Sequence, residues 1–373
     1  MSQLYLPSGY KDADSLNQKL HNEAESTWQK KGETRVLALF HDMAERVPAY
    51  ADFLKSKNFH ASSVTNIDQF QTIPAVDKDN YLRKYPHEML CWDGKFDQGQ
   101  WVISTTSGST GIPYYFPREK SQNYQYAIMA EQYLRTNFSV HKKSTLYIVA
   151  FPMGAWIGGV FTYDALQIIK DRSSYDLSII TPGIHKQEVI NAVKQLGHKF
   201  DQIIIGAYAP FLKDILDDGR RDGIDWHKYD IGFIFSAEAF SEKFRDFVLH
   251  STTQKNELTA TLNHYGTVDL GTMAHETPES IMIRRKLVED KKLKILFPES
   301  HRQPTFAQYN PELFYFDNID NNLFCSAYSG MPLVRYDLKD YGGILSREDV
   351  HARLNEEGYD VDSLAKKADI GSY

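Results

Sequence analysis

The chain has 373 residues, 42% of them hydrophobic and 24% charged, an ordinary globular composition with enough apolar residues for a large core. Its net charge is −7 and its pI is about 6.0, and no basic stripe runs along it, so we expect neither a nucleic-acid nor a membrane partner. Two cysteines, Cys91 and Cys325, are too few for a disulfide framework or a four-cysteine zinc site.

The first 95 residues are expected to form a helical N-terminal part of a larger domain. The N-terminus lacks the charged-then-apolar layout of a signal peptide, which predicts a cytoplasmic protein. Between residues 13 and 57, apolar side chains recur at three- and four-residue spacing, and this pattern predicts helices. Residues 73–82 predict a turn followed by a short helix. We find no motif that carries chemistry in this part of the sequence.

Residues 104–113 read Ser-Thr-Thr-Ser-Gly-Ser-Thr-Gly-Ile-Pro and lie between two strand-like runs, residues 100–104 and 114–117. Glycines let the backbone approach a ligand closely, and hydroxyls and successive N–H groups donate hydrogen bonds to an anion. The loop is not a Walker loop, because no Gly-Lys-Ser/Thr follows. The residues alone leave two interpretations open, a cradle for phosphate oxygens and a plain hairpin turn.

From residue 119 to residue 250, helical and strand-like patterns alternate. Buried strands are predicted at residues 144–150, 177–181, 202–206 and 231–236. This order predicts a mostly parallel sheet covered by helices, and thus an α/β core over residues 96–280. In such sheets, ligands bind at the carboxyl ends of the strands. We therefore expect a site formed by residues 151–159, 206–208 and 236–238.

From about residue 281 the pattern changes to short strands without helices between them, at residues 305–309, 313–316 and 322–325. The change predicts a small antiparallel, barrel-like subdomain over residues 281–345. Residues 346–360 predict a helix. We assign residues 346–373 to the start of a segment that leads to a further domain.

Five motifs follow one another in a fixed order between residues 104 and 340. They read Thr105-Thr-Ser-Gly-Ser-Thr-Gly-Ile-Pro, Gly154-Ala-Trp-Ile-Gly-Gly, Ser236-Ala-Glu-Ala-Phe, Asn263-His-Tyr-Gly-Thr-Val-Asp-Leu-Gly and Met331-Pro-Leu-Val-Arg-Tyr-Asp-Leu-Lys-Asp. The first resembles the phosphate loop of the acyl-adenylate-forming superfamily. The whole set is most similar to its phenylacetate–CoA ligase branch, which includes the CapK-like proteins. The resemblance implies a large N-terminal adenylation domain with mostly parallel sheets.

The resemblance also implies nucleotide-binding roles. Tyr265 would stack on adenine, the backbone at Ala237 and Glu238 would read the adenine edge, and Asp340 would accept hydrogen bonds from the ribose hydroxyls. Asp269 would bind Mg²⁺. Further contacts to ATP would come from the loop residues Ser107, Gly108, Ser109, Thr110 and Gly111 and from the motif residues His264, Gly266 and Thr267.

The same resemblance implies a catalytic set and an acyl pocket. Catalysis would involve Thr106, Ser107, Thr110 and Asp269. The acyl pocket would be lined by Phe151, Trp156, Gly159, Ala207 and Tyr208.

Single residues also have simpler interpretations, and these stay open at this point. Tyr265 is equally a core aromatic, and His264 a buried or rim histidine with its hydrogen bonds satisfied. Asp340 is also suited to capping a turn, and Trp156 is also suited to an apolar core. Glu238 is also suited to a solvated position at the start of a helix.

The sequence departs from the family pattern at several positions. Ile112 stands where many members carry a lysine, Val268 replaces a threonine, and Asp269 replaces a glutamate that is one methylene longer. The sequence stops at Tyr373, whereas the family continues into a hinge and a mobile lid. Three alternatives stay open: the sequence is a fragment of a longer protein, the lid is supplied by another segment or chain, or the activity has changed. A homodimer also stays open.

These features predict ATP-dependent activation of a carboxylic acid, aryl or fatty, to an acyl-adenylate, followed by transfer to coenzyme A. ATP, Mg²⁺ and coenzyme A would be required. One alternative is a nucleotide-binding homologue without catalysis, which Ile112 and Val268 favour. The other is an acyl-protein synthetase-like acyltransferase that loads Cys325. A Ser-His-Asp hydrolase is disfavoured, because the sequence has no Gly-x-Ser-x-Gly elbow.

Overall fold

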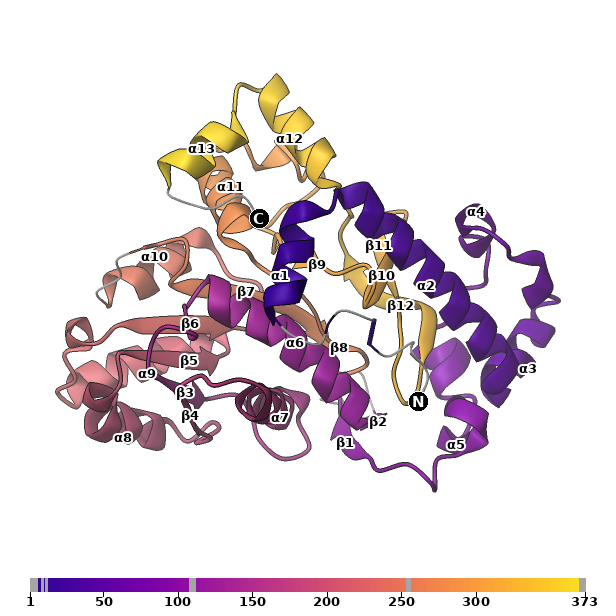
Figure 1. Cartoon of the computed structure of the whole chain (residues 1–373), viewed down its shortest axis with the longest axis horizontal. Helices are drawn as coiled ribbons and strands as arrows, with labels where there is room; N and C mark the ends of the chain where they lie inside the picture. The colour runs from indigo at the N-terminus through magenta and orange to yellow at the C-terminus, as the bar shows by residue number, and fades with distance from the viewer. Residues whose placement is uncertain (1–5, 8–9, 11–12, 107–111, 253–255, 369–373) are drawn as a thin grey trace. The chain divides into compact units, whose positions relative to one another are not determined.

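The computed structural model describes residues 6–7, 10, 13–106, 112–252 and 256–368 (Figure 1). It divides into two compact units, and each unit combines stretches that are distant in the sequence. Unit 1 comprises Met1–Ser104, Tyr114–Gln125 and Tyr309–Arg347. Unit 2 comprises Thr105–Pro113, Tyr126–Gln308 and Glu348–Tyr373.

Unit 1 begins with the helices that the apolar spacing predicts. They are α1 (Ala13–Asn22), α2 (Glu25–Arg46) and α3 (Pro48–Ser56). Val47 adopts an extended conformation between α2 and α3, and Pro48 occupies the first turn of α3, where its missing N–H costs nothing. Phe40 of α2 meets Tyr50 and Phe70 edge-on, with ring centroids 6.2 and 6.3 Å away. The short elements α4 (Ile67–Phe70), a π-helical turn (Lys78–Leu82) and α5 (His87–Leu90) complete this helical part.

The remainder of unit 1 is β-structure. β10 (Phe314–Ile319), β11 (Asn322–Ala327) and β12 (Leu333–Tyr341) form an antiparallel sheet, which confirms the predicted antiparallel part. The sheet is joined to the helical part through Val76, whose N–H donates to the carbonyl oxygen of Arg335 at 3.1 Å. The pair β1 (Val102–Thr105) and β2 (Tyr115–Arg118) flanks the predicted phosphate loop.

Unit 2 contains a sheet in which β4 (Leu177–Ile180), β3 (Thr145–Val149), β5 (Gln202–Ala207), β6 (Ile231–Phe235) and β7 (Thr261–Thr267) lie side by side in this order. All these strands are parallel, and β8 (Gly271–His275) pairs antiparallel with β7. Every residue of β5 is buried, as expected of a parallel strand with both faces covered. The predicted α/β class is therefore confirmed.

Helices cover both faces of this sheet. On one face, α8 (Lys186–Leu196), α9 (Ala209–Arg221) and α10 (Glu242–His250) pack on strand residues such as Ile203 and Ile205. On the other face, α7 (Ile157–Arg172) and the residues of α6 (Lys120–Thr136) from Tyr126 onward pack around Ile204. Alternate residues of β5 thus face opposite layers, which fixes the register of the strand.

Residue 281, where the sequence pattern predicts a change to short strands, lies inside helix α11 (Pro278–Glu289). Thr277 caps α11 with a capping box, and Pro278 occupies the first turn. These helix-start signals outweigh the preference of the following β-branched residues for a strand. The expected strand at residues 305–309 shrinks to β9 (Gln308–Tyr309). After β12, α12 (Arg347–Glu356) confirms the predicted helix, and α13 (Val361–Lys367) follows it. No helix in the described part of the chain has the length and apolar character needed to cross a membrane.

Candidate functional site

The carboxyl ends of the parallel strands of unit 2 gather most of the predicted site residues at one edge of the sheet. Because parallel strands point the same way, the segments that follow β3, β5, β6 and β7 emerge at the same edge. The edge carries Phe151, Trp156, Gly159, Ala207, Tyr208, Ala237, Glu238, His264, Tyr265, Gly266, Thr267 and Asp269.

The segment after β3 is packed tightly against the neighbouring strand. A Cβ atom on Gly206 of β5 would lie 2.7 Å from a ring carbon of Phe151 and 2.9 Å from the hydroxyl of Tyr147, so only glycine fits here. Phe151 is buried, whereas Trp156, which precedes α7, is 46% exposed. The interpretation of Trp156 as a core residue is therefore wrong, and its indole is accessible at this edge.

The segment after β6 has an unusual backbone. Ala237 adopts a left-handed conformation, with φ of +75°, and both Ala237 and Glu238 are exposed. A non-glycine residue in this region costs about 1–3 kcal/mol and persists only when the surrounding structure fixes it. The backbone of this turn is thus presented to solvent in a fixed, strained shape.

Strand β7 and the turn after it contribute Tyr265, Gly266 and Asp269 to this edge. Tyr265 is half-buried and lies opposite Ala274 of β8, and Gly266 follows where an added Cβ would lie 2.5 Å from the carbonyl oxygen of Gly271. Asp269 is 8% exposed and lies in the turn between β7 and β8. The turn is tightened by Thr267, whose hydroxyl accepts from the N–H of Leu270 at 3.2 Å.

His264 points to the opposite side of β7 from Tyr265 and is 5% exposed. Its ring lies 4.8 Å from that of Tyr133 and 6.1 Å from that of Tyr126, and it faces His275 across the β7–β8 ladder. Burial, with a smaller contribution from His275, lowers the pKa of His264 to about 3. The imidazole is therefore neutral and supports the edge from beneath.

The predicted phosphate loop is described only at its ends. Ser107, Gly108, Ser109, Thr110 and Gly111 lie outside the described residues, and Thr106, just before them, is half-buried. The N–H of Thr105 donates to the carbonyl oxygen of Ala155 at 2.9 Å, which ties the start of the loop to the glycine-rich segment after β3. After the loop, the buried side chain of Arg118 donates to the hydroxyl of Ser104 at 2.6 Å.

Asp340, the predicted ribose ligand, belongs to unit 1. It lies near the carboxyl end of β12 and is half-buried. The preceding Lys339 bonds Asp337 at 2.6 Å and Asp77 at 3.0 Å, which anchors the end of the strand. Arg335 of the same motif is buried and donates to the carbonyl oxygens of Gln71 and Ile73.

A magnesium ion is compatible with the residues at the edge only together with a phosphate ligand. No group of three or more His, Cys, Asp or Glu side chains suited to a metal occurs among the described residues. Mg²⁺ is commonly bound by one or two carboxylates together with substrate phosphates. The single carboxylate of Asp269 at this edge suits that mode of binding.

The two cysteines are poorly suited to chemistry. Cys91 and Cys325 are both buried. Burial raises the pKa of Cys91 to about 12 and holds the pKa of Cys325 well above its ordinary value. Because the thiolate is the nucleophile, a buried thiol with a raised pKa is inert.

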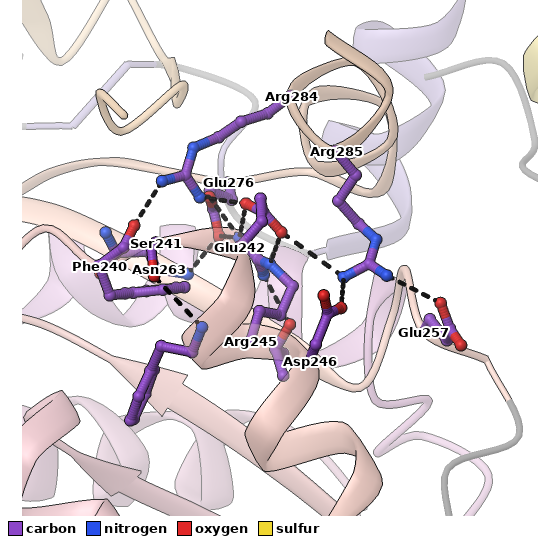
Figure 2. Close-up of polar contacts among 12 residues, drawn as sticks. Phe240, Ser241, Glu242, Arg245, Asp246, Glu257, Asn263, Glu276, Arg284 and Arg285 are labelled. Atoms are coloured by element: carbon purple, nitrogen blue, oxygen red, sulfur yellow. Dashed lines mark hydrogen bonds and ion pairs between the residues drawn. The ribbon is translucent and has the colours of Figure 1, made fainter. Parts of the chain in front are cut away.

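Sequence reasoning missed a group of buried charges behind the segment after β6. Glu242, Arg245, Glu276 and Arg284 contact one another and the backbone of Phe240 (Figure 2). A signal was present, because Arg284 follows Ser280 and precedes Leu287 at helical spacing on the buried side of α11. A charge on a buried helical stripe needs a partner, but the sequence does not say which one.

No family model and no curated protein matches the chain. Structures of 2-hydroxyisobutyryl-CoA ligase share its fold. An open conformation in complex with 2-HIB-AMP and CoA has a TM-score of 0.64 at 11% identity, over 86% of this chain and 70% of that chain. The thioesterification state has a TM-score of 0.63 at 12% identity, over 86% of this chain and 64% of that chain. Over most of its length the chain therefore shares the fold of 2-hydroxyisobutyryl-CoA ligase.

Proposed function

We propose that this chain activates a carboxylic acid with ATP, forming an acyl-adenylate whose acyl group is then transferred to the thiol of coenzyme A with release of AMP. One observation carries the proposal: the glycine-rich segment after β3, the strained turn at Ala237 and the Tyr265 motif emerge at one edge of a parallel sheet. The fold likeness supports it, because the similar ligase was solved with 2-HIB-AMP and CoA. The phenylacetate–CoA ligase branch is our proposal for the subtype.

Each site residue has a role in this proposal. Tyr265 stacks on adenine, and the exposed backbone at Ala237 and Glu238 reads the adenine edge. The loop at Thr106 and beyond donates to the β- and γ-phosphates, as its hydroxyls and glycines suit. Asp340 accepts from the ribose hydroxyls. Asp269 would hold Mg²⁺, whose charge would offset that of the phosphates.

In this reaction the protein mainly has to position two anions, the carboxylate of the acid and ATP. A carboxylate oxygen of the acid forms a bond to the α-phosphorus, and the bond from that phosphorus to the bridging oxygen breaks, so the electron pair leaves with pyrophosphate. Fixed N–H and hydroxyl donors stabilise the charge that spreads over the phosphate oxygens. The acyl-adenylate then requires shelter from water. Phe151, Trp156, Gly159, Ala207 and Tyr208 line the proposed acyl pocket and favour an aryl or fatty acid.

A nucleotide-binding protein without catalysis is the alternative that Ile112 and Val268 favour. The acyltransferase alternative has less support, because burial raises the pKa of the Cys325 thiol and so disfavours the thiolate that this reaction requires.

The test is carboxylate-dependent exchange of pyrophosphate into ATP, across a panel of aryl and fatty acids, with calorimetric titration of ATP alongside. We expect Tyr265→Ala to weaken ATP binding about 5- to 150-fold, since stacking of a base on an aromatic ring contributes about 1–3 kcal/mol. Tyr359→Ala serves as the control, because Tyr359 bonds Asp290 at 2.8 Å near the protein surface. ATP binding without exchange for any acid would favour the non-catalytic alternative, and no ATP binding would reject both.

A further inference from the structure

Four charged side chains form a cluster in the interior of unit 2, which we term the buried ion cluster. Its members are Glu242 and Arg245 of α10, Glu276 after β8, and Arg284 of α11. Their exposed fractions are 3%, 0%, 0% and 1%, respectively. With two carboxylates and two guanidinium groups, the cluster carries no net charge (Figure 2).

Glu276 fixes β7 close to the Tyr265 motif. Both carboxylate oxygens accept from one nitrogen of Arg245, at 2.8 and 2.9 Å, and one of them also accepts from the N–H of Asn263 at 2.9 Å. The N–H of Glu276 returns a hydrogen bond to the carbonyl oxygen of Asn263, again at 2.9 Å. Asn263 precedes Tyr265 by two residues, so this clamp sets the position of the predicted adenine platform.

Arg284 fixes the segment after β6. Its guanidinium donates to the carbonyl oxygen of Phe240 and to the carboxylate of Glu242. The ring of Phe240 lies 5.0 Å from the guanidinium of Arg245 and 5.6 Å from that of Arg284. Phe240 follows Glu238 by two residues, so Arg284 sets the end of the strained turn that begins at Ala237.

The two clamps are parts of one network, because Arg245 bonds both carboxylates. Its Nε donates to Glu242 at 2.8 Å, and its Nη1 donates to the hydroxyl of Thr261 on β7 at 2.6 Å. Burial opposes the charge on Arg245, but Glu276 and Glu242 outweigh it and raise its pKa. Burial lowers the pKa of Arg284, yet a guanidinium stays protonated in proteins. Each of the four side chains is therefore paired with at least one member of opposite charge.

Stability alone does not account for such a cluster. Buried ion pairs are often no more stabilising than apolar residues of the same volume, because removing the charges from water is costly. Their bonds are directional, however, and planar guanidinium forks hold carboxylates in a defined geometry. A left-handed alanine in an exposed turn requires that kind of support from the structure around it.

We propose that Arg284 and Glu276 are positioning residues for the nucleotide, which set the spacing between the turn at Ala237–Glu238 and the ring of Tyr265. The inference rests on the proposed function, since it assigns both elements to the adenine. Neither residue contacts the nucleotide itself. Loss of Arg284 would release the turn, and loss of Glu276 would release β7.

The test compares Arg284→Met with Lys286→Met, which removes the same charge from the same helix at a half-exposed position outside the cluster. Titration of AMP by calorimetry gives the nucleotide affinity without contributions from the outer phosphates. Steady-state exchange gives separate KM values for ATP and for the acid. We expect Arg284→Met to weaken AMP binding at least about tenfold, which is the size of effect that the loss of one charge-assisted hydrogen bond produces. The KM for ATP should rise by a similar factor. The KM for the acid stays within about twofold, as do all values in Lys286→Met.

Two further variants keep the inference testable if Arg284→Met fails to fold. The double variant Glu242→Gln with Arg284→Met removes one charge of each sign and keeps the cluster neutral, and we expect the same loss of AMP affinity. Arg284→Lys retains the charge with fewer donors and should restore part of it. Wild-type AMP affinity in a folded variant without Arg284 would overturn the inference alone. If the wild-type chain binds neither AMP nor ATP, the proposed function fails and this inference fails with it.

Discussion

At the scale of single residues, the neutral histidine beneath the candidate site is the most consequential. His264 is enclosed by Tyr126, Tyr133 and His275, and no hydrogen-bond partner occurs for its Nε2 among the described residues. Protonation would place a charge in this apolar and aromatic setting. Because burial lowers the pKa of His264 to about 3, the folded protein keeps the ring neutral at every pH above that value.

This pKa shift makes folding sensitive to acid. An unfolded chain protonates His264 near pH 6.5, so the unfolded state binds more protons than the folded state below that pH. The stabilisation is fully present above about pH 6.5 and is lost progressively as the pH falls toward the folded pKa. We expect the urea-unfolding midpoint to fall between pH 6.5 and 4 more steeply in the wild type than in His264→Gln. Parallel profiles for the two proteins would contradict this explanation.

At the scale of elements, close packing between β3 and β5 predicts a different sensitivity. Gly206→Ala would press a methyl group into the ring of Phe151 and the hydroxyl of Tyr147. Overpacking of this kind costs about 1–3 kcal/mol, so we expect a lower unfolding free energy in urea titrations. Gly343→Ala is the control, because an added Cβ there has no heavy atom within 4 Å. Equal stability of both variants would contradict this prediction, because it would show that the segment after β3 shifts to accommodate the methyl group at little cost.

The elements themselves were largely predictable, because hydrophobic period is a local signal. The strands β3, β5 and β6 lie where the apolar runs predict them, and helices alternate with strands up to residue 250 as the pattern predicts. Helix α11 was missed, because Ile281 and Ile283 read equally well as part of a strand, and the capping signal at Thr277 decides between the two.

Only those parts of the candidate site that belong to contiguous sequence motifs could be predicted from the sequence. Tyr265 and Ala237 belong to short motifs at strand ends, and the parallel order of the strands brings those ends to one edge. The buried ion cluster joins Glu242 to Arg284, which are 42 residues apart and share no motif. Such pairs depend on how α10 and α11 pack, and a single sequence contains no local pattern for that contact.

At the scale of the whole molecule, unit 1 is completed late in the sequence. Arg335 donates to the carbonyl oxygen of Gln71, 264 residues earlier, and Tyr10 donates to Glu312 at 2.8 Å, 302 residues later. Unit 2 by contrast takes most of its residues from one stretch, Tyr126–Gln308. We expect a ribosome-bound chain stalled with residue 308 outside the ribosome to protect β3–β7 from trypsin while cleavage occurs after Arg46 and Lys55 in α2 and α3. Full protection of both helices in that stalled chain would contradict this order of folding.

The discontinuous course of unit 1 has a consequence during synthesis. At about 5–20 residues per second, the 264 residues between Gln71 and Arg335 take roughly 13–50 s to translate. During that interval Phe70 lacks Tyr315, whose ring meets it edge-on at 5.7 Å, and Val76 lacks its backbone partners on β12. Apolar surface and unpaired backbone are then exposed together, a combination that promotes aggregation and that chaperones bind. The yield of this protein in cells should therefore depend on translation speed and on chaperone supply more than on the final stability of the fold.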